Sequence, residues 1–161
     1  MVRVIQSHHS TGNRQTIVVQ LYMYRKGRTV ALVVDTSVII AVLVSEPERE
    51  ALIQVTRGAE LMAPESVHWE VGNALAATLK RGRITIEQAQ RAIDAYQEIP
   101  LRRVDVDLKL SLEIADARGI HAYDAYVVAA GIRHRSSVLT LDRGLTAAAK
   151  ASGCRVIEVA R

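Results

Sequence analysis

Four acidic residues lie in segments that are otherwise aliphatic, at positions where they could act together. Asp35 follows the apolar run Val30 to Val34, and Asp142 follows a second apolar run. Glu70 and Asp124 come early in two helical patterns. Taken singly, Asp35 would serve as a helix cap and the other acids as surface residues. Because ligands of open α/β sheets bind beyond the carboxyl ends of the strands, we expect all four carboxylates to meet at that edge.

Such a cluster of carboxylates predicts a divalent cation. Close carboxylates raise one another's pKa, and a bound cation relieves this repulsion. A set of oxygen ligands without His or Cys favours Mg²⁺, with Mn²⁺ as a substitute, over zinc. An ion of this kind activates water and neutralises the charge of a phosphodiester, which is the chemistry of acid-lined nucleases.

Hydroxyl and guanidinium groups near these acids are candidates for binding the substrate. Ser37 and Thr140 can form hydrogen bonds with water or phosphate, and Arg143, directly after Asp142, can hold a phosphate. Thr36 and Ser37 also suit the N-cap of the helix that follows, and we expect this role for Thr36.

The elements that must position these groups alternate between strand and helix. Apolar runs without alternation indicate strands buried on both faces, and strands separated by helices pair in parallel. We therefore predict a three-layer α/β/α sandwich whose mainly parallel sheet has about five strands. The predicted strands are 30–34, 59–63, 101–104, 137–141 and 155–159, and the predicted helices are 38–44, 48–57, 64–80, 85–97, 108–118, 120–133 and 143–152.

Two of these helices carry more detailed expectations. Pro64 suits the first turn of the third helix, because its missing N–H is not needed there. In the helix 108–118, Leu108, Leu112 and Ala115 have helical spacing, and we expect them to face the core.

Length and composition indicate one domain with an aliphatic core. The 161 residues are 49% hydrophobic but only 4% aromatic, and they include no Phe. The single cysteine, Cys154, cannot form an internal disulfide, which is typical of the reducing cytoplasm. No apolar run approaches the roughly 20 residues of a membrane-spanning helix, so we expect no association with a membrane.

The positive charge of the chain is concentrated in residues 1–29. This stretch contains five Lys and Arg residues and no acid, so the net charge of +4 does not describe the rest of the chain. We interpret 1–29 as a basic N-terminal extension, either disordered or the result of a misassigned start site, and 30–161 as the domain. Within the extension, the segment 16–24 has the composition of an edge strand.

Four segments resemble the successive motifs of the PIN-domain family, in particular its VapC-type toxins of toxin–antitoxin modules. They are VVDTSVI (33–39), PESVHWEVGNAL (64–75), AYDAY (122–126) and LTLDRGL (139–145). The order and spacing of these motifs agree with the family from about Val30 to Val159. The extension departs from the family, because PIN toxins usually begin near the first strand.

The resemblance implies a cytoplasmic, magnesium-dependent endoribonuclease that cleaves tRNA, rRNA or mRNA. It also implies a homodimer, and a cognate antitoxin whose C-terminal segment lies across the active-site groove. The residues that match the family's catalytic and metal-binding acids are Asp35, Glu70, Asp124 and Asp142, with Asp35 and Asp124 as the direct metal ligands. Asn73 matches a family position that is commonly polar and is a further candidate for substrate binding.

Other functions fit the sequence less well. An aspartyl phosphotransferase usually has a second acid two residues after its nucleophile, where this chain has Ser37. A response regulator would carry its acceptor aspartate after the third strand, where this chain has only the helix-capping Asp105. A PIN-like scaffold that binds RNA or protein without cleavage is the alternative to the nuclease.

Basic and aromatic residues provide further candidates for contacts with RNA. The basic residues are Lys80, Arg81, Arg83, Arg133, Arg135 and Arg143. Apart from Arg143, we interpret them as solvated charges at helix ends. The aromatic residues of the domain are Trp69, Tyr96, Tyr123 and Tyr126, and they do not predict which base is recognised.

Overall fold

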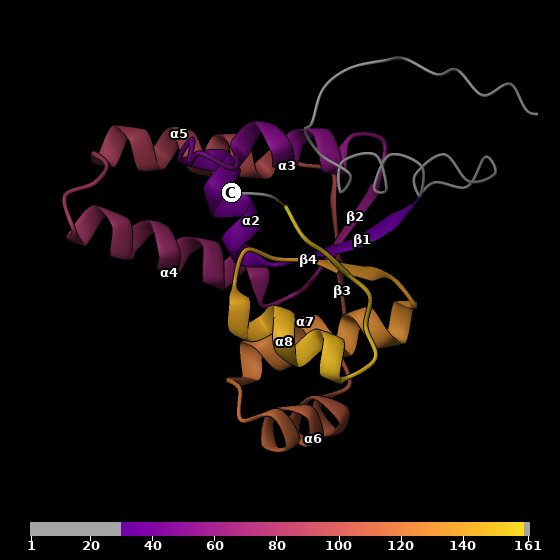
Figure 1. Cartoon of the computed structure of the whole chain (residues 1–161). Coiled ribbons are helices and arrows are strands. Elements are labelled where there is room, and N and C mark those ends of the chain that lie inside the picture. Colours follow the sequence, from indigo (N-terminus) through magenta and orange to yellow (C-terminus); the bar gives the residue numbers. More distant parts are fainter. Residues whose placement is uncertain (1–29, 160–161) are drawn as a thin grey trace, which may run out of the picture.

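The computed structural model describes residues 30–159, which form one five-stranded sheet with helices on both faces (Figure 1). The strands are β1 (Ala31–Val34), β2 (Glu60–Pro64), β3 (Leu101–Val104), β4 (Ser137–Leu139) and β5 (Val156–Ile157), in the order β3-β2-β1-β4-β5. The helices are α2 (Thr36–Leu43), α3 (Arg49–Thr56), α4 (Val67–Lys80), α5 (Ile86–Gln97), α6 (Leu108–Arg118), α7 (Ala122–His134) and α8 (Arg143–Ala151). All pairings are parallel, which confirms the predicted α/β/α sandwich.

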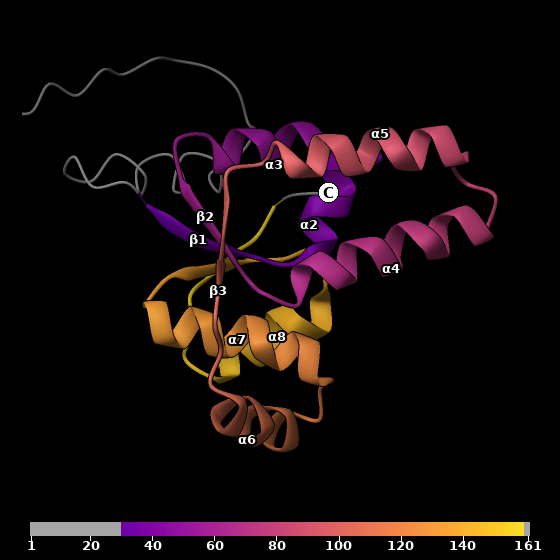
Figure 2. The ribbon, with the colours of Figure 1, turned by 180° about the vertical axis from the view of Figure 1, so that it is seen from behind.

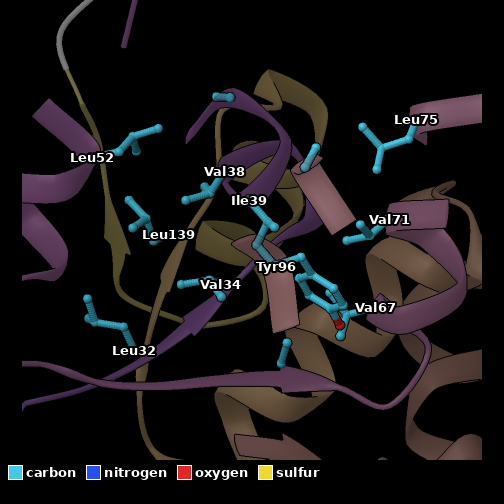
Figure 3. Packing of buried hydrophobic residues seen from close by; sticks show 13 residues of the cluster. Leu32, Val34, Val38, Ile39, Leu52, Val67, Val71, Leu75, Tyr96 and Leu139 are labelled. Carbon is cyan, nitrogen blue, oxygen red and sulfur yellow. The ribbon is translucent and has the colours of Figure 1, made fainter. Parts of the chain in front are cut away.

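The central strand β1 is apolar without alternation because both of its faces are covered. Successive side chains of a strand point to opposite faces of the sheet. Leu32 and Val34 pack in a hydrophobic cluster with α2, α4 and α5, whereas Val33 packs in a second cluster with α7 and α8. Figure 2 shows these helices on opposite sides of the sheet, and Figure 3 shows the first cluster.

Strands β1 and β4 are parallel neighbours and end at the same level. Val34 lies opposite Leu139 in the register. The backbone N–H of Asp35 donates a hydrogen bond of 3.0 Å to the carbonyl oxygen of Leu139. The residues that follow the two strands therefore leave the sheet side by side.

The start of α4 differs from the prediction. Pro64 is the last residue of β2 and does not belong to the first turn of the helix, which begins at Val67 after its N-cap Ser66. Proline has no N–H to donate, but it is tolerated at this strand end. The hydrogen bond to the carbonyl oxygen of Val104 on β3 comes from the N–H of the next residue, Glu65, at 3.2 Å.

Helix α6 turns a different face to the core from the one predicted. Leu108 and Leu112 are 60% and 65% exposed, whereas Ser111 and Ile114 are buried. Only Ala115 packs against the core as expected. The segment contains two apolar stripes with helical spacing, and periodicity alone cannot choose between them. In the structure, the packing of α6 against α7 determines which of the two stripes is buried.

None of the helices within residues 30–159 is long and apolar enough to cross a membrane. The edge strand predicted at 16–24 lies outside the described residues, as does the rest of the basic extension. The division of the chain at residue 30 therefore stays a prediction.

Two helical glycines provide a paired test of the packing between α7 and β4. A Cβ atom at Gly131 would lie 2.9 Å from Cγ2 of Val138 and 3.3 Å from Sγ of Cys154, whereas a Cβ at Gly72 would meet nothing within 4 Å. Val138 is fully buried and cannot easily move aside. We expect Gly131→Ala to lower the free energy of unfolding by about 1–2 kcal/mol, because overpacking outweighs the better helix propensity of alanine.

The matched variant Gly72→Ala should instead raise the free energy of unfolding by about 0.5–1 kcal/mol, because only the helix propensity changes. Urea denaturation of both variants measures the two effects. Equal stabilisation by the two substitutions would contradict the close approach of α7 to β4.

Candidate active site

The four predicted acids all lie at the N-termini of helices at the carboxyl edge of the sheet. Asp35 and Asp142 are the N-caps of α2 and α8, and Glu70 and Asp124 lie in the first turns of α4 and α7. The N-terminus of a helix carries a partial positive charge that stabilises a carboxylate. Four helix dipoles therefore offset part of the repulsion between these acids.

Asp35 is held in place by hydroxyl groups from both neighbouring strand ends. Its side chain is buried, with 8% exposure. The carboxylate oxygen Oδ2 accepts hydrogen bonds from Ser37 Oγ at 2.5 Å, from Thr140 Oγ1 at 2.9 Å and from the backbone N–H of Ser37 at 3.2 Å. The two hydroxyl oxygens in turn accept from the backbone N–H groups of Leu141 and Asp142. Ser37 and Thr140, which we predicted to bind substrate, thus orient Asp35.

Thr36 has a different role from the predicted one. Asp35 itself is the N-cap of α2, and Thr36 is the first residue of the helix. The Thr36 hydroxyl donates to Oε2 of Glu70 at 3.0 Å, and the Ser66 hydroxyl donates to Oε1 of the same carboxylate at 2.7 Å. Sequence analysis missed Ser66, although its spacing of four residues from Glu70 places the two on one helix face.

Asp124 carries the clearest sign that the acids lie close together. Its pKa is raised above the ordinary value, first by burial and then by the negative charges of Asp35, Asp142 and Glu70. His121, three residues earlier in the chain, partly offsets this rise in the pKa. The structure thus brings together the carboxylates that the sequence placed in four separate segments.

The remaining candidates divide into those near the acids and those far from them. Asn73 is exposed on α4, one turn after Glu70, and Arg143 is exposed at the start of α8. Arg133 and Arg135 lie at the opposite end of α7 from Asp124, at least roughly 14 Å along the helix axis. These two arginines are therefore not part of the site.

The donor chemistry of the site suits a hard cation. Among residues 30–159, no three carboxylate, imidazole or thiol side chains are arranged so that they would hold a metal ion together. Mg²⁺, however, keeps most of its water ligands and commonly binds through one or two carboxylates. The hydrogen bonds of Asp35 found among the described residues converge on Oδ2, so that Oδ1 would be available, together with Asp124, to hold an ion. A cation there would also relieve the repulsion that acts on Asp124.

The family model of the PIN domain matches residues 32–151, a range that includes all four acids. The chain belongs to the PIN-domain family. A search among curated proteins found no relative of this chain.

Three solved structures share the PIN fold of this chain. PAE2754 from Pyrobaculum aerophilum has a TM-score of 0.62 and 23% identity, over 81% of this chain and 92% of that chain. FitAcB from Neisseria gonorrhoeae has a TM-score of 0.58 and 18% identity, over 79% and 96%. VapBC2 from Rickettsia felis, bound to a DNA fragment from their promoter, has a TM-score of 0.56 and 12% identity, over 78% and 96%. At these identities, the similarity establishes the fold.

Asp124→Asn tests the repulsion within this PIN domain. Because the pKa of Asp124 is raised in the folded state, its ionised form destabilises the fold at neutral pH, whereas below the ordinary value of 3.8 the penalty is absent. We expect Asp124→Asn to raise the free energy of unfolding at pH 7 by up to about 1 kcal/mol, a modest gain for a partly exposed group. The gain should shrink as the pH falls toward 3.8.

Urea denaturation in EDTA at pH 7 and pH 4 measures this difference. Asp116→Asn is the matched control, because Asp116 is an exposed acid of α6, and its stability should equal that of the original protein. A loss of stability in Asp124→Asn at pH 7 would assign the Asp124 carboxylate a structural role.

Proposed function

We propose that this PIN domain is a Mg²⁺-dependent endoribonuclease and the toxin of a type II toxin–antitoxin module. The observation that carries the proposal is the convergence of Asp35, Glu70, Asp124 and Asp142 at one edge of the sheet. Such a concentration of negative charge costs stability and is typical of functional sites. The resemblance of the motifs to VapC-type toxins adds RNA as the substrate.

In this proposal, Asp35 and Asp124 would hold the ion, with Mn²⁺ as a substitute for Mg²⁺. When bound, the ion supplies activation of water and neutralisation of charge on the phosphodiester. Ser37 and Thr140 keep the Asp35 carboxylate in a fixed orientation through the hydrogen bonds to Oδ2.

Glu70 and Asp142 are the other two acids of the proposed site, and hydrogen bonds hold both of them in place. Both carboxylate oxygens of Glu70 accept hydroxyl hydrogen bonds, which fix the position of its negative charge, and this charge would add to the attraction of a cation. Oδ1 of Asp142 accepts from the backbone N–H of Leu145 at 2.7 Å, which fixes this carboxylate at the start of α8. Arg143, exposed next to Asp142, binds a phosphate of the substrate.

Partners of the protein follow from the same resemblance. We expect a homodimer in the cytoplasm, and a cognate antitoxin whose C-terminal segment covers the groove beside the four acids. Among the proteins of similar fold, VapBC2 is bound to a DNA fragment from their promoter. The alternative is a scaffold with the same fold that binds RNA or protein without cleaving it.

Removal of the Asp35 carboxylate should distinguish a nuclease from a scaffold that binds RNA or protein without cleavage. We expect Asp35→Ala to reduce Mg²⁺-dependent cleavage of total RNA by about 100-fold or more, because it removes a metal ligand. Asp116→Ala, which removes an exposed acid from α6, should retain the activity. The measurement is the rate of RNA fragmentation with Mg²⁺ and with EDTA.

Metal binding provides a readout that does not depend on cleavage. Mg²⁺ should raise the melting temperature of the original protein and of Asp116→Ala, but not that of Asp35→Ala, because a ligand stabilises only the form that binds it. RNA binding without fragmentation and without this thermal shift would favour the scaffold.

The toxin assignment is tested in growing cells. Expression of the chain in a bacterial host should arrest growth, and co-expression of the small gene next to it should restore growth. The Asp35→Ala variant should permit growth when it accumulates to the same level. Equal growth arrest by both forms would contradict a toxic activity that depends on this site.

A further inference from the structure

The edge of the sheet opposite the four acids carries a cluster of basic residues. Helix α7 leads directly into β4, so its last turn, with Arg133, lies at the amino edge where the strands begin. Figures 1 and 2 both place the end of α7 on the same side of the molecule as the beginning of β1. Along the axis of α7, Arg133 is roughly 14 Å from Asp124. The cluster is therefore separate from the candidate active site.

Contacts between β2, β3 and α7 define this cluster. Nε of Arg102 on β3 donates to Oε1 of Glu60 at 2.7 Å, which holds the guanidinium near the beginning of β2. The pKa of His134, in the last turn of α7, is lowered first by burial and then by the positive charges of Arg102 and Arg133. Two arginines from different elements therefore lie close to one imidazole.

Positive charge exceeds negative charge at this place. The negative charge that acts on His134 is that of Glu60, and it is already paired with Arg102. Because its pKa is lowered, His134 itself is neutral at pH 7. Arg133 and Arg135 are exposed, and within residues 30–159 no hydrogen bond or ion pair engages their side chains. Their charges are therefore available to an anionic ligand.

Arg135 occupies a backbone conformation that favours glycine. It ends α7 in the left-handed region, with φ at 50° and ψ at 35°. Near the ends of α3, α6 and α8, this conformation is taken by Gly58, Gly119 and Gly153. A side chain with a Cβ atom costs energy in this region, so glycine would end α7 at a lower cost. Helix termination therefore does not explain the arginine at this position.

Cations at the end of a helix complement its dipole, and this effect alone would explain Arg133. It does not explain Arg102, which belongs to a strand. The basic stretch 1–29 also joins the domain at this edge, because the carbonyl oxygen of Val30 accepts a hydrogen bond from the N–H of Glu60 at 2.9 Å. Separate segments thus bring positive charge to one edge of the sheet.

We propose that Arg133 and Arg135, together with Arg102, bind phosphate groups of the RNA substrate at a second site on the amino edge of the sheet. This inference rests on the proposed nuclease function. The guanidinium group is suited to phosphate because it donates two parallel hydrogen bonds. Phosphates are repelled near the four acids, so a basic site on the opposite edge supplies binding energy that the acidic edge cannot.

The separation of the two sites indicates the class of substrate. At roughly 3.4 Å per base pair, a stem of about four base pairs is needed to cover 14 Å. A folded RNA with a longer stem can therefore contact both edges at once, whereas a very short oligonucleotide cannot.

Binding without cleavage tests the second site directly. The probe is a fluorescein-labelled RNA hairpin with a stem of 12 base pairs, titrated with the full-length protein in EDTA and followed by fluorescence anisotropy. We expect Arg133→Ala to weaken binding by about 5-fold or more in 0.1 M salt, because one phosphate contact is lost. The slope of log K against log salt concentration should fall by about 1.

Arg91→Ala is the matched control, because it removes the same charge from an exposed position on α5, a helix that packs on the opposite face of the sheet. This control should change neither the affinity nor the slope. Asp35→Ala should also bind the hairpin as tightly as the original protein, since its carboxylate lies at the other edge.

Arg135→Gly separates binding from a structural role. Glycine adopts the left-handed conformation without strain, so this variant should melt at a higher temperature than the original protein. Its affinity for the hairpin should nevertheless fall by about 5-fold or more. A lower melting temperature would assign the Arg135 side chain to the fold and contradict its place in the site.

Cleavage kinetics relate the second site to the nuclease. With Mg²⁺, Arg133→Ala should raise the KM for the hairpin while kcat changes little. The KM for a trinucleotide should stay unchanged, because its one phosphate besides the cleaved one cannot reach the amino edge.

The outcomes separate this inference from the nuclease proposal. Unchanged affinity in Arg133→Ala and Arg135→Gly, or an equal loss of affinity in Arg91→Ala, would overturn the second site. If Asp35→Ala abolished cleavage while the arginine variants bound normally, the nuclease would stand without it. If the arginine variants lost binding but no form of the protein cleaved RNA, the phosphate site would stand as part of a scaffold that binds RNA.

Discussion

Repulsion between carboxylates at one edge of the sheet is the constraint around which this domain is built. The adjacent parallel strands β1 and β4 bring Asp35 and Asp142 to the same level, and the first turns of α4 and α7 add two further acids. Helix N-termini and hydroxyl groups offset much of this charge. Within residues 30–159, no hydrogen bond reaches the Asp124 side chain, and its pKa remains raised. The fold thus leaves the repulsion on Asp124 only partly offset.

The hydroxyl groups around the acids hold the carboxylates in place. Ser37 and Thr140 join Asp35 to the end of β4, and Thr36 joins α2 to Glu70 on α4. In the proposed nuclease, a carboxylate oriented in this way would need no rearrangement when charge develops in the reaction. The contact of Thr140 with Asp35 connects residues 105 positions apart in the chain, and that of Thr36 with Glu70 connects residues 34 positions apart. The packing of these segments and the orientation of the acids therefore depend on one network.

In the proposed function, an acidic site that attracts a metal ion would repel the phosphates of RNA, so the binding energy for the strand would have to come from elsewhere. The described domain has no general excess of positive charge to provide it, because the basic residues of 1–29 account for the net charge of the chain.

The sequence by itself determined the order of strands and helices, because this order follows from local apolar patterns. It also determined the parallel sheet and the edge at which the acids gather, because parallel strands end at one edge of a sheet. The tertiary structure alone decided which apolar stripe of α6 faces the core and where Pro64 lies. It also decided that Thr140 binds Asp35. Each of these depends on contacts between segments far apart in the chain, and such contacts leave no trace in local periodicity.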